Sequence, residues 1–201
     1  TATERLANFR ARGPSYDYRA SGFQTGADLF RSSSDLAGVY IGTGQVNSTV
    51  QNIYGGPAAG SVRMDGYSLG GYWTHRDTSG WYTDSMLQGT WYGRIRTTSK
   101  DPLQPQALKA SGTGLLASVE GGYPIALGKG LVVEPQAQLL YQWTGISNTA
   151  DGFGQIHFGN TSAIIGRLGG RVTQDWNMDS ARPLKTWARL NVWHTFGGSS
   201  N

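Results

Sequence analysis

The sequence predicts an all-β protein, and more narrowly a transmembrane antiparallel β-barrel of the outer-membrane type. Three observations lead to this class: long stretches in which apolar and polar residues alternate, connections that are alternately short and long, and an unusual composition. Charged residues make up 15% of the 201 positions and 30 residues are glycine. Soluble domains average about 25% charged residues and about 7% glycine. Few charges with many glycines therefore favour a membrane-embedded β protein.

The composition also excludes several classes of function. There is no cysteine, which removes disulfides, thiol catalysis and cysteine-ligated zinc. The net charge of +4 is spread along the chain without a dense basic cluster, so we expect no nucleic-acid partner. No apolar run reaches the length of about 18 residues that a transmembrane helix requires, so any crossing must use strands. Three scattered histidines and the absence of a phosphate-binding loop predict neither metal nor cofactor.

Alternation with a period of two residues marks the expected strands. It is clearest at 80–96, 131–145 and 184–196 and noisier in the other six candidates, and 1–9 also allows a helix. Most of the candidates have ten residues or more, whereas soluble strands usually have about five or six. Membrane-spanning strands need about 9–11 residues. The nine candidate strands are 5–12, 18–30, 35–47, 62–75, 80–96, 107–123, 131–145, 162–175 and 184–196.

The connections between these strands alternate in length. Short turns are expected at 31–35, 77–80, 125–130 and 175–183. Longer segments rich in Gly, Pro, Ser, Thr and Asn occupy 47–61, 97–106 and 146–161. Outer-membrane barrels have short periplasmic turns and longer extracellular loops, so the pattern favours that architecture over a soluble sandwich.

The apolar face of the strands ends in aromatic residues. Trp81 and Trp91 share one face of a strand and lie ten residues apart. At about 3.3 Å per residue and a tilt near 40°, they are separated by roughly 25 Å along the barrel axis, the height of the apolar band between two aromatic girdles. We expect the lipid-facing and girdle residues to be Tyr67, Trp73, Trp81, Trp91, Tyr123, Leu131, Leu139 and Trp143.

The opposite face is polar and charged. Ionisable side chains on strand interiors cannot lie in a dry core, so this face predicts a wet lumen with internal ion pairs. We expect the pore-lining residues to be Arg10, Arg12, Asp28, Asp84, Arg94, Arg96, Glu120, Glu134, Gln136, Gln138, Arg167, Arg171 and Arg189.

One motif suggests catalysis. The segment 66–70, GYSLG, matches the G-x-S-x-G nucleophile elbow of serine hydrolases. That elbow requires a helix directly after the serine, whereas Ser68 lies within an alternating strand pattern. We therefore expect no catalytic residue and no enzymatic activity.

Seven stretches, in order, resemble the translocator β-domain of classical autotransporters of the pertactin type. The most specific are LVVEPQAQLLYQ at 131–142 and the stretch before it, GTGLLASVEGGYP at 112–124, which ends in SVEGGYP. The other matching stretches lie at 21–30, 35–44, 66–75, 80–92 and 164–172. Together they cover nearly the whole chain.

The resemblance implies an outer-membrane barrel of about a dozen strands. Its lumen holds a linker helix joined to an N-terminal passenger, which the domain anchors and helps to secrete with the barrel-assembly machinery and without ATP. We find neither a passenger nor a linker helix in the sequence, and the family's last strands have no counterpart. We therefore expect residues 1–201 to be a single translocator domain, incomplete at its C-terminus. Two alternatives remain open: another barrel, such as a porin or a membrane-embedded esterase, and a soluble carbohydrate-binding β-domain.

Overall fold

The computed structural model describes residues 2–6, 16–51, 59–99, 107–150, 155–156, 159–176 and 184–200. These residues form strands connected by turns, and no helix among them is long and apolar enough to cross a membrane. The strands are β1 (Ala2–Leu6), β2 (Tyr16–Arg31), β3 (Asp35–Val50), β4 (Gly60–Arg76), β5 (Tyr82–Ser99), β6 (Ala107–Gly122), β7 (Ile125–Gly128), β8 (Leu131–Ile146), β9 (Thr149–Ala150), β10 (Gln155–Ile156), β11 (Thr161–Trp176) and β12 (Leu184–Ser200).

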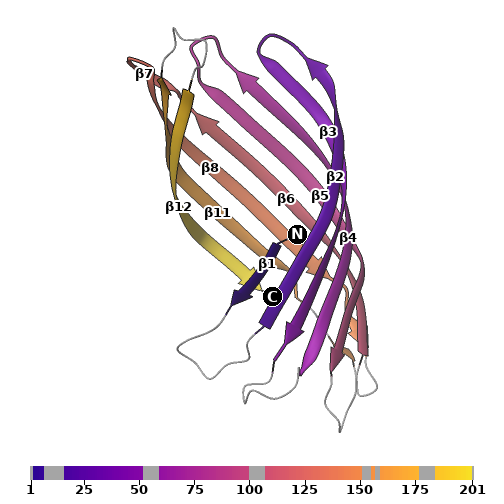
Figure 1. Cartoon of the computed structure of the whole chain (residues 1–201). Helices are drawn as coiled ribbons and strands as arrows, with labels where there is room; N and C mark the ends of the chain where they lie inside the picture. Colours follow the sequence, from indigo (N-terminus) through magenta and orange to yellow (C-terminus); the bar gives the residue numbers. More distant parts are fainter. Residues whose placement is uncertain are drawn as a thin grey trace.

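Nine of these strands form one antiparallel sheet in the order β1-β2-β3-β4-β5-β6-β8-β11-β12. The short β7 pairs with β8, and β9 and β10 form a separate hairpin. The sheet is strongly curled into a wall of tilted strands (Figure 1). This confirms the predicted class and the nine-strand count. The first strand, expected at 5–12, is observed at 2–6, and residues 7–15 lie outside the described part.

The described sheet has two edges. β1 pairs with β2 and β12 pairs with β11, and no pairing joins β1 to β12 among the described residues. The next strand beyond each edge is therefore not supplied by the residues that the structure describes.

The connections fall into two sets at opposite ends of the strands (Figure 1). One end has the tight turns at 32–34 and 77–81 and the β7 hairpin, as expected from the sequence. Glycine is required in these turns, because Gly80, Gly128 and Gly130 have φ of 100°, 88° and 79°. The longer connections, including the one that contains β9 and β10, lie at the other end. Much of these longer connections, and the expected turn at 177–183, lies outside the described residues.

The polarity of the sheet is the reverse of that in a soluble protein. The only buried hydrophobic side chains among the described residues are Tyr40 and Ile95. Leu168 and Phe23, by contrast, are 70% and 69% exposed. Because no second layer among the described residues covers either face, burial arises where side chains crowd on the concave side of the curled sheet. The large exposed hydrophobic residues of the described sheet include Phe23, Leu168 and Val192.

Aromatic side chains on the sheet lie directly over glycines of neighbouring strands. A Cβ added to Gly122 would lie 2.5 Å from the Tyr82 ring, and one added to Gly166 would lie 2.5 Å from the Phe196 ring. Glycine at these positions leaves room for the ring, and the ring covers backbone that a side chain would otherwise cover. This explains why a long-stranded sheet tolerates so many glycines.

Candidate functional site

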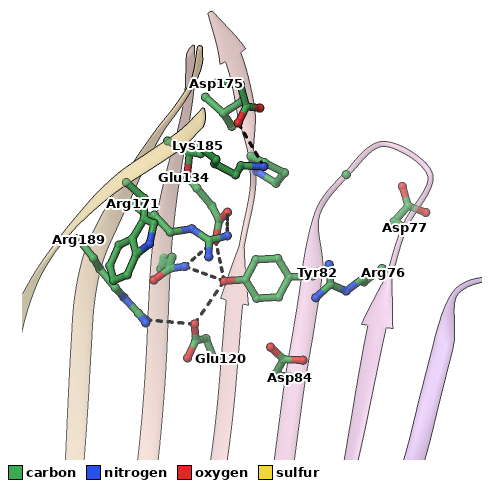
Figure 2. A pocket seen from close by; sticks show the side chains of 16 residues that line it. Arg76, Asp77, Tyr82, Asp84, Glu120, Glu134, Arg171, Asp175, Lys185 and Arg189 are labelled. Carbon is green, nitrogen blue, oxygen red and sulfur yellow. Dashed lines mark hydrogen bonds and ion pairs between the residues drawn. The ribbon is translucent and has the colours of Figure 1, made fainter. Parts of the chain in front are cut away.

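The concave face encloses a polar cavity of about 860 Å³ at the short-turn end of the sheet. Its walls come from six strands that are far apart in sequence: β4, β5, β6, β8, β11 and β12 (Figure 2). Period-two alternation directs every second side chain of each strand into this space. The cavity is therefore built by the polar halves of the alternating segments.

Glu134 is the centre of one hydrogen-bonded group in the cavity. Its side chain is 5% exposed, and its Oε2 accepts a hydrogen bond from Arg171 Nη2 at 2.6 Å. The Tyr82 hydroxyl lies 3.0 Å from Glu134 Oε1 and 3.3 Å from Glu120 Oε1 (Figure 2). Gln136 Nε2 donates to the Tyr82 hydroxyl at 2.9 Å. Tyr82 thereby links the carboxylates of β6 and β8.

Arg167 is the centre of a second group, and it is only 3% exposed. Its Nη2 lies 2.7 Å from Glu120 Oε2. This contact is an ion pair without hydrogen-bond geometry. Its Nε donates to Gln138 Oε1 at 2.9 Å, and its Nη1 donates to Asn191 Oδ1 at 2.7 Å. The guanidinium also lies 5.6 Å from the Trp193 ring centre. One arginine thus contacts side chains from three other strands.

Weaker pairs surround these two groups. Arg189 Nη2 lies 3.6 Å from Glu120 Oε1, and Lys185 Nζ lies 3.5 Å from Asp175 Oδ1. Because the carboxylates of β6 and β8 meet the cations of β11 and β12, the charges on this face compensate one another locally. Such a face is compatible with water or with a polar segment inside the barrel, and incompatible with a dry apolar core. No group of three or more His, Asp or Glu that could hold a metal is found in the part of the chain that the structure describes.

Comparison with known proteins identifies the family. The model of the autotransporter β-domain matches residues 4–201. The chain belongs to the autotransporter β-domain family.

Relatives and solved structures agree with this assignment. The chain is 29% identical over 196 residues to the adhesin BmaC autotransporter of Brucella suis, covering 92% of the chain and 6% of that protein. It is 25% identical over 189 residues to the pertactin autotransporter of Bordetella bronchiseptica, covering 93% of the chain and 20% of that protein. The fold matches the crystal structure of the β-domain of the Bordetella autotransporter BrkA with a TM-score of 0.71 at 20% identity, covering 96% of this chain and 76% of the other.

These matches confirm the resemblance expected from the sequence. Autotransporter β-domains reside in the bacterial outer membrane and are transport units, not enzymes. The chain nevertheless spans a small part of the curated relatives that it matches, 6% of BmaC and 20% of pertactin.

The autotransporter β-domain brings together most of the polar residues singled out from the sequence. Glu134, Gln136 and Arg167 are buried on the concave face, and Asp84 lines the cavity beside them. Asp28 accepts a hydrogen bond from the Tyr72 hydroxyl. The others that take part in the two groups above are Glu120, Gln138, Arg171 and Arg189. Arg10 and Arg12 lie outside the described residues.

Arg94 and Arg96 are placed differently from the sequence expectation. A β-bulge at Gly93 inserts one extra residue in β5, so Arg94 pairs with Asp65 and Arg96 pairs with Arg63. The bulge reverses the alternation. Both arginines are exposed and lie on the face of Trp91, whereas unbroken alternation from Asp84 had assigned them to the opposite face.

The apolar residues singled out from the sequence lie mostly on the exposed face. Tyr67 and Trp91 are cross-strand partners and are 64% and 52% exposed. Leu131 and Trp143 are half-buried, the former because the β7 hairpin pairs beside it. The remaining exposed members are Trp73, Trp81, Tyr123 and Leu139.

Sequence analysis did not single out Tyr82 and Asn191, which complete the two polar groups, or Tyr40, which lies outside them. Tyr40 donates a hydrogen bond to Gln88 Oε1 at 2.9 Å, six residues along β5 from Tyr82. Alternation could have identified Tyr82, because it stands two residues before Asp84 and therefore lies on the same face of the strand. Ser68, the candidate nucleophile, lies on β4, and its Oγ is 2.9 Å from Thr90 Oγ1 on β5. The Ser68 hydroxyl therefore contacts the hydroxyl of a neighbouring strand and none of the described histidines.

Proposed function

We propose that this β-domain anchors an N-terminal passenger in the bacterial outer membrane and serves its passage to the cell surface. The proposal extends to the partners that this role requires: a linker helix within the barrel and the barrel-assembly machinery. Family membership supports the proposal, because the matched relatives are autotransporters and this chain corresponds to the β-domain. Residues 1–201 act in this proposal as a single translocator unit.

The observation that carries the proposal is the change of polarity between adjacent residues. Arg167 is 3% exposed and the next residue, Leu168, is 70% exposed. An ordinary soluble sheet buries the leucine and exposes the arginine. We infer that the concave polar residues line a wet lumen and that the exposed aromatic and aliphatic residues contact lipid. Arg94 and Arg96 belong to the outer surface in this proposal.

The two sheet edges support a further part of the proposal. In lipid, each unpaired backbone N–H or C=O group costs several kcal/mol, so neither β1 nor β12 can present a bare edge to the membrane. We infer that further strands, another chain or an assembly factor pairs with these edges in the cell.

Secretion of a fused reporter tests this role. A reporter domain is joined through a linker helix to Thr1, the strands that complete the sheet are supplied after Asn201 from a related β-domain, and the fusion is expressed with a secretion signal. Digestion of the reporter by external protease in intact cells measures surface delivery. The fusion should deliver reporter to the surface, whereas periplasmic retention of a correctly membrane-inserted fusion would contradict the proposal.

Leu168→Arg should reduce membrane insertion, because arginine on the lipid face costs about 2–4 kcal/mol at mid-membrane. Thr173→Arg, which adds the same side chain on the cavity wall, is the matched control.

A further inference from the structure

The outer face of the sheet carries a row of basic residues at the long-loop end. The rows are defined by strand pairing: Tyr67 of β4 pairs with Trp91 of β5, and four residues further toward the loops Arg63 pairs with Arg96. The bulge at Gly93 is what keeps Arg96 on this outer face. The whole row runs across β2 to β6 and consists of Arg19, Asn47, Arg63, Arg96 and Lys109. Four of its five members are cationic and all five are exposed.

A depression of about 560 Å³ lies between this basic row and the pair of aromatic residues Tyr67 and Trp91. Arg63 and Arg94 stand at its basic side, with one carboxylate, Asp65, 3.4 Å from Arg63 Nε. The Arg63 side chain is 53% exposed in spite of this ion pair. The other side chains of the wall are the Gln45 amide, which faces Arg63, and four hydroxyl-bearing or aromatic residues: Ser21, Thr43, Phe23 and Tyr67.

The depth of the depression matches that of lipid headgroups. Four residues of strand correspond to about 13 Å, or roughly 10 Å along the axis at a tilt near 40°. Tyr67 and Trp91 mark the aromatic girdle, where the hydrocarbon region ends. The headgroup layer adds roughly 5–8 Å on each side of the hydrocarbon core, so the Arg63 and Arg96 backbones lie just beyond its outer edge, and their long side chains can reach back into it.

We propose that this depression, the Arg63–Arg94 site, binds the phosphorylated headgroup of a lipid in the leaflet that faces the long loops. Guanidinium groups bind phosphate oxygens through paired, charge-assisted hydrogen bonds. The Ser21 hydroxyl supplies an additional donor at the depth of Arg94, and the Thr43 hydroxyl supplies one at the depth of Tyr67. The acyl chains of the lipid then extend past Phe23 and Tyr67 toward the apolar band. Only the assignment to one leaflet rests on the proposed translocator function.

Binding of a defined phosphorylated lipid tests the site directly. The chain in neutral detergent is titrated into phosphatidylcholine vesicles with and without bisphosphorylated lipid A, and the dissociation constant is measured from Trp fluorescence. Arg63→Gln with Arg94→Gln should weaken binding about tenfold, as expected if each exposed charge contact contributes about 0.7 kcal/mol. Removing the phosphate groups from the lipid should weaken binding of the unsubstituted chain to the same extent.

The matched control removes two positive charges at the other end of the sheet. Arg31→Gln with Lys129→Gln changes the net charge equally, and should leave the affinity for lipid A within about twofold of that of the unsubstituted chain. If both double variants weaken lipid A binding equally, or if Arg63→Gln with Arg94→Gln does not weaken it, the proposed binding site is wrong. Displacement of lipid A by inorganic phosphate at equal phosphate concentration would overturn the assignment to a lipid. Because the assay measures no secretion, its failure is distinguishable from failure of the translocator role.

Discussion

Replacing Arg167 by methionine should destabilise the folded sheet more than any replacement of an exposed charge. Methionine keeps a long unbranched side chain, so the loss is that of the guanidinium contacts. Glu120, whose side chain is 19% exposed, would keep the Tyr82 hydroxyl at 3.3 Å and the longer ion contact to Arg189 at 3.6 Å. The acceptors Gln138 Oε1 and Asn191 Oδ1 would lose their 2.9 Å and 2.7 Å donors.

The expected magnitude follows from these contacts. Breaking a buried ion pair by removing one partner costs about 3–5 kcal/mol. Each orphaned acceptor adds about 1 kcal/mol when water cannot reach it. Because water in the lumen can solvate Glu120 and both acceptors, the lower limit applies, and we expect a loss of about 3 kcal/mol.

Reversible denaturation of the chain folded into phosphatidylcholine vesicles, followed by Trp fluorescence, measures this loss as a change in the free energy of unfolding. A double-mutant cycle with Glu120→Gln should give a coupling energy of about 2 kcal/mol. Arg31→Met is the control, because its 3.1 Å pair with Asp28 is exposed and should contribute less than about 1 kcal/mol. A coupling energy near zero, or a loss no larger than that of the control, would refute the role assigned to Arg167.

Three further predictions follow from the two faces and the glycine contacts. Spin labels at Ala137 and Gln136 should report apolar and polar surroundings respectively, and the same environment at both would contradict the register of β8. Ser68→Ala should leave folding and any associated activity unchanged, since hydrolysis of a chromogenic ester that depends on Ser68 would restore the hydrolase interpretation. Gly122→Ala should lower the free energy of unfolding by about 1–3 kcal/mol, because the new methyl group overlaps the neighbouring ring. Gly197→Ala, with no atom within 4 Å of the added Cβ, is its control and should cost little.

The sequence by itself determined the class of fold, the strands and most of the polar face. Side chains of an extended chain alternate strictly between two sides, so the composition of each side is readable without a structure. For that reason Glu134, Gln136 and Gln138 were placed together on one face, opposite Leu139. Strand length and the asymmetry of the connections then indicated the membrane, and the ordered stretches indicated the family.

Only the tertiary structure decided which residues meet across strands. Arg167, Glu120 and Asn191 lie on β11, β6 and β12, and their contact depends on the register of every strand between them. Register is a property of pairing between strands, so alternation within one strand does not contain it.

The β-bulge in β5 shows the same limit within a single strand. One extra residue at Gly93 reverses the faces of Arg94 and Arg96, and thereby adds Arg96 to the basic row on the outer surface. A bulge is defined by a residue that the neighbouring strand leaves unpaired, and therefore exists only once two strands are side by side. Local alternation determines which residues share a face, but the partner strand determines where that alternation is interrupted.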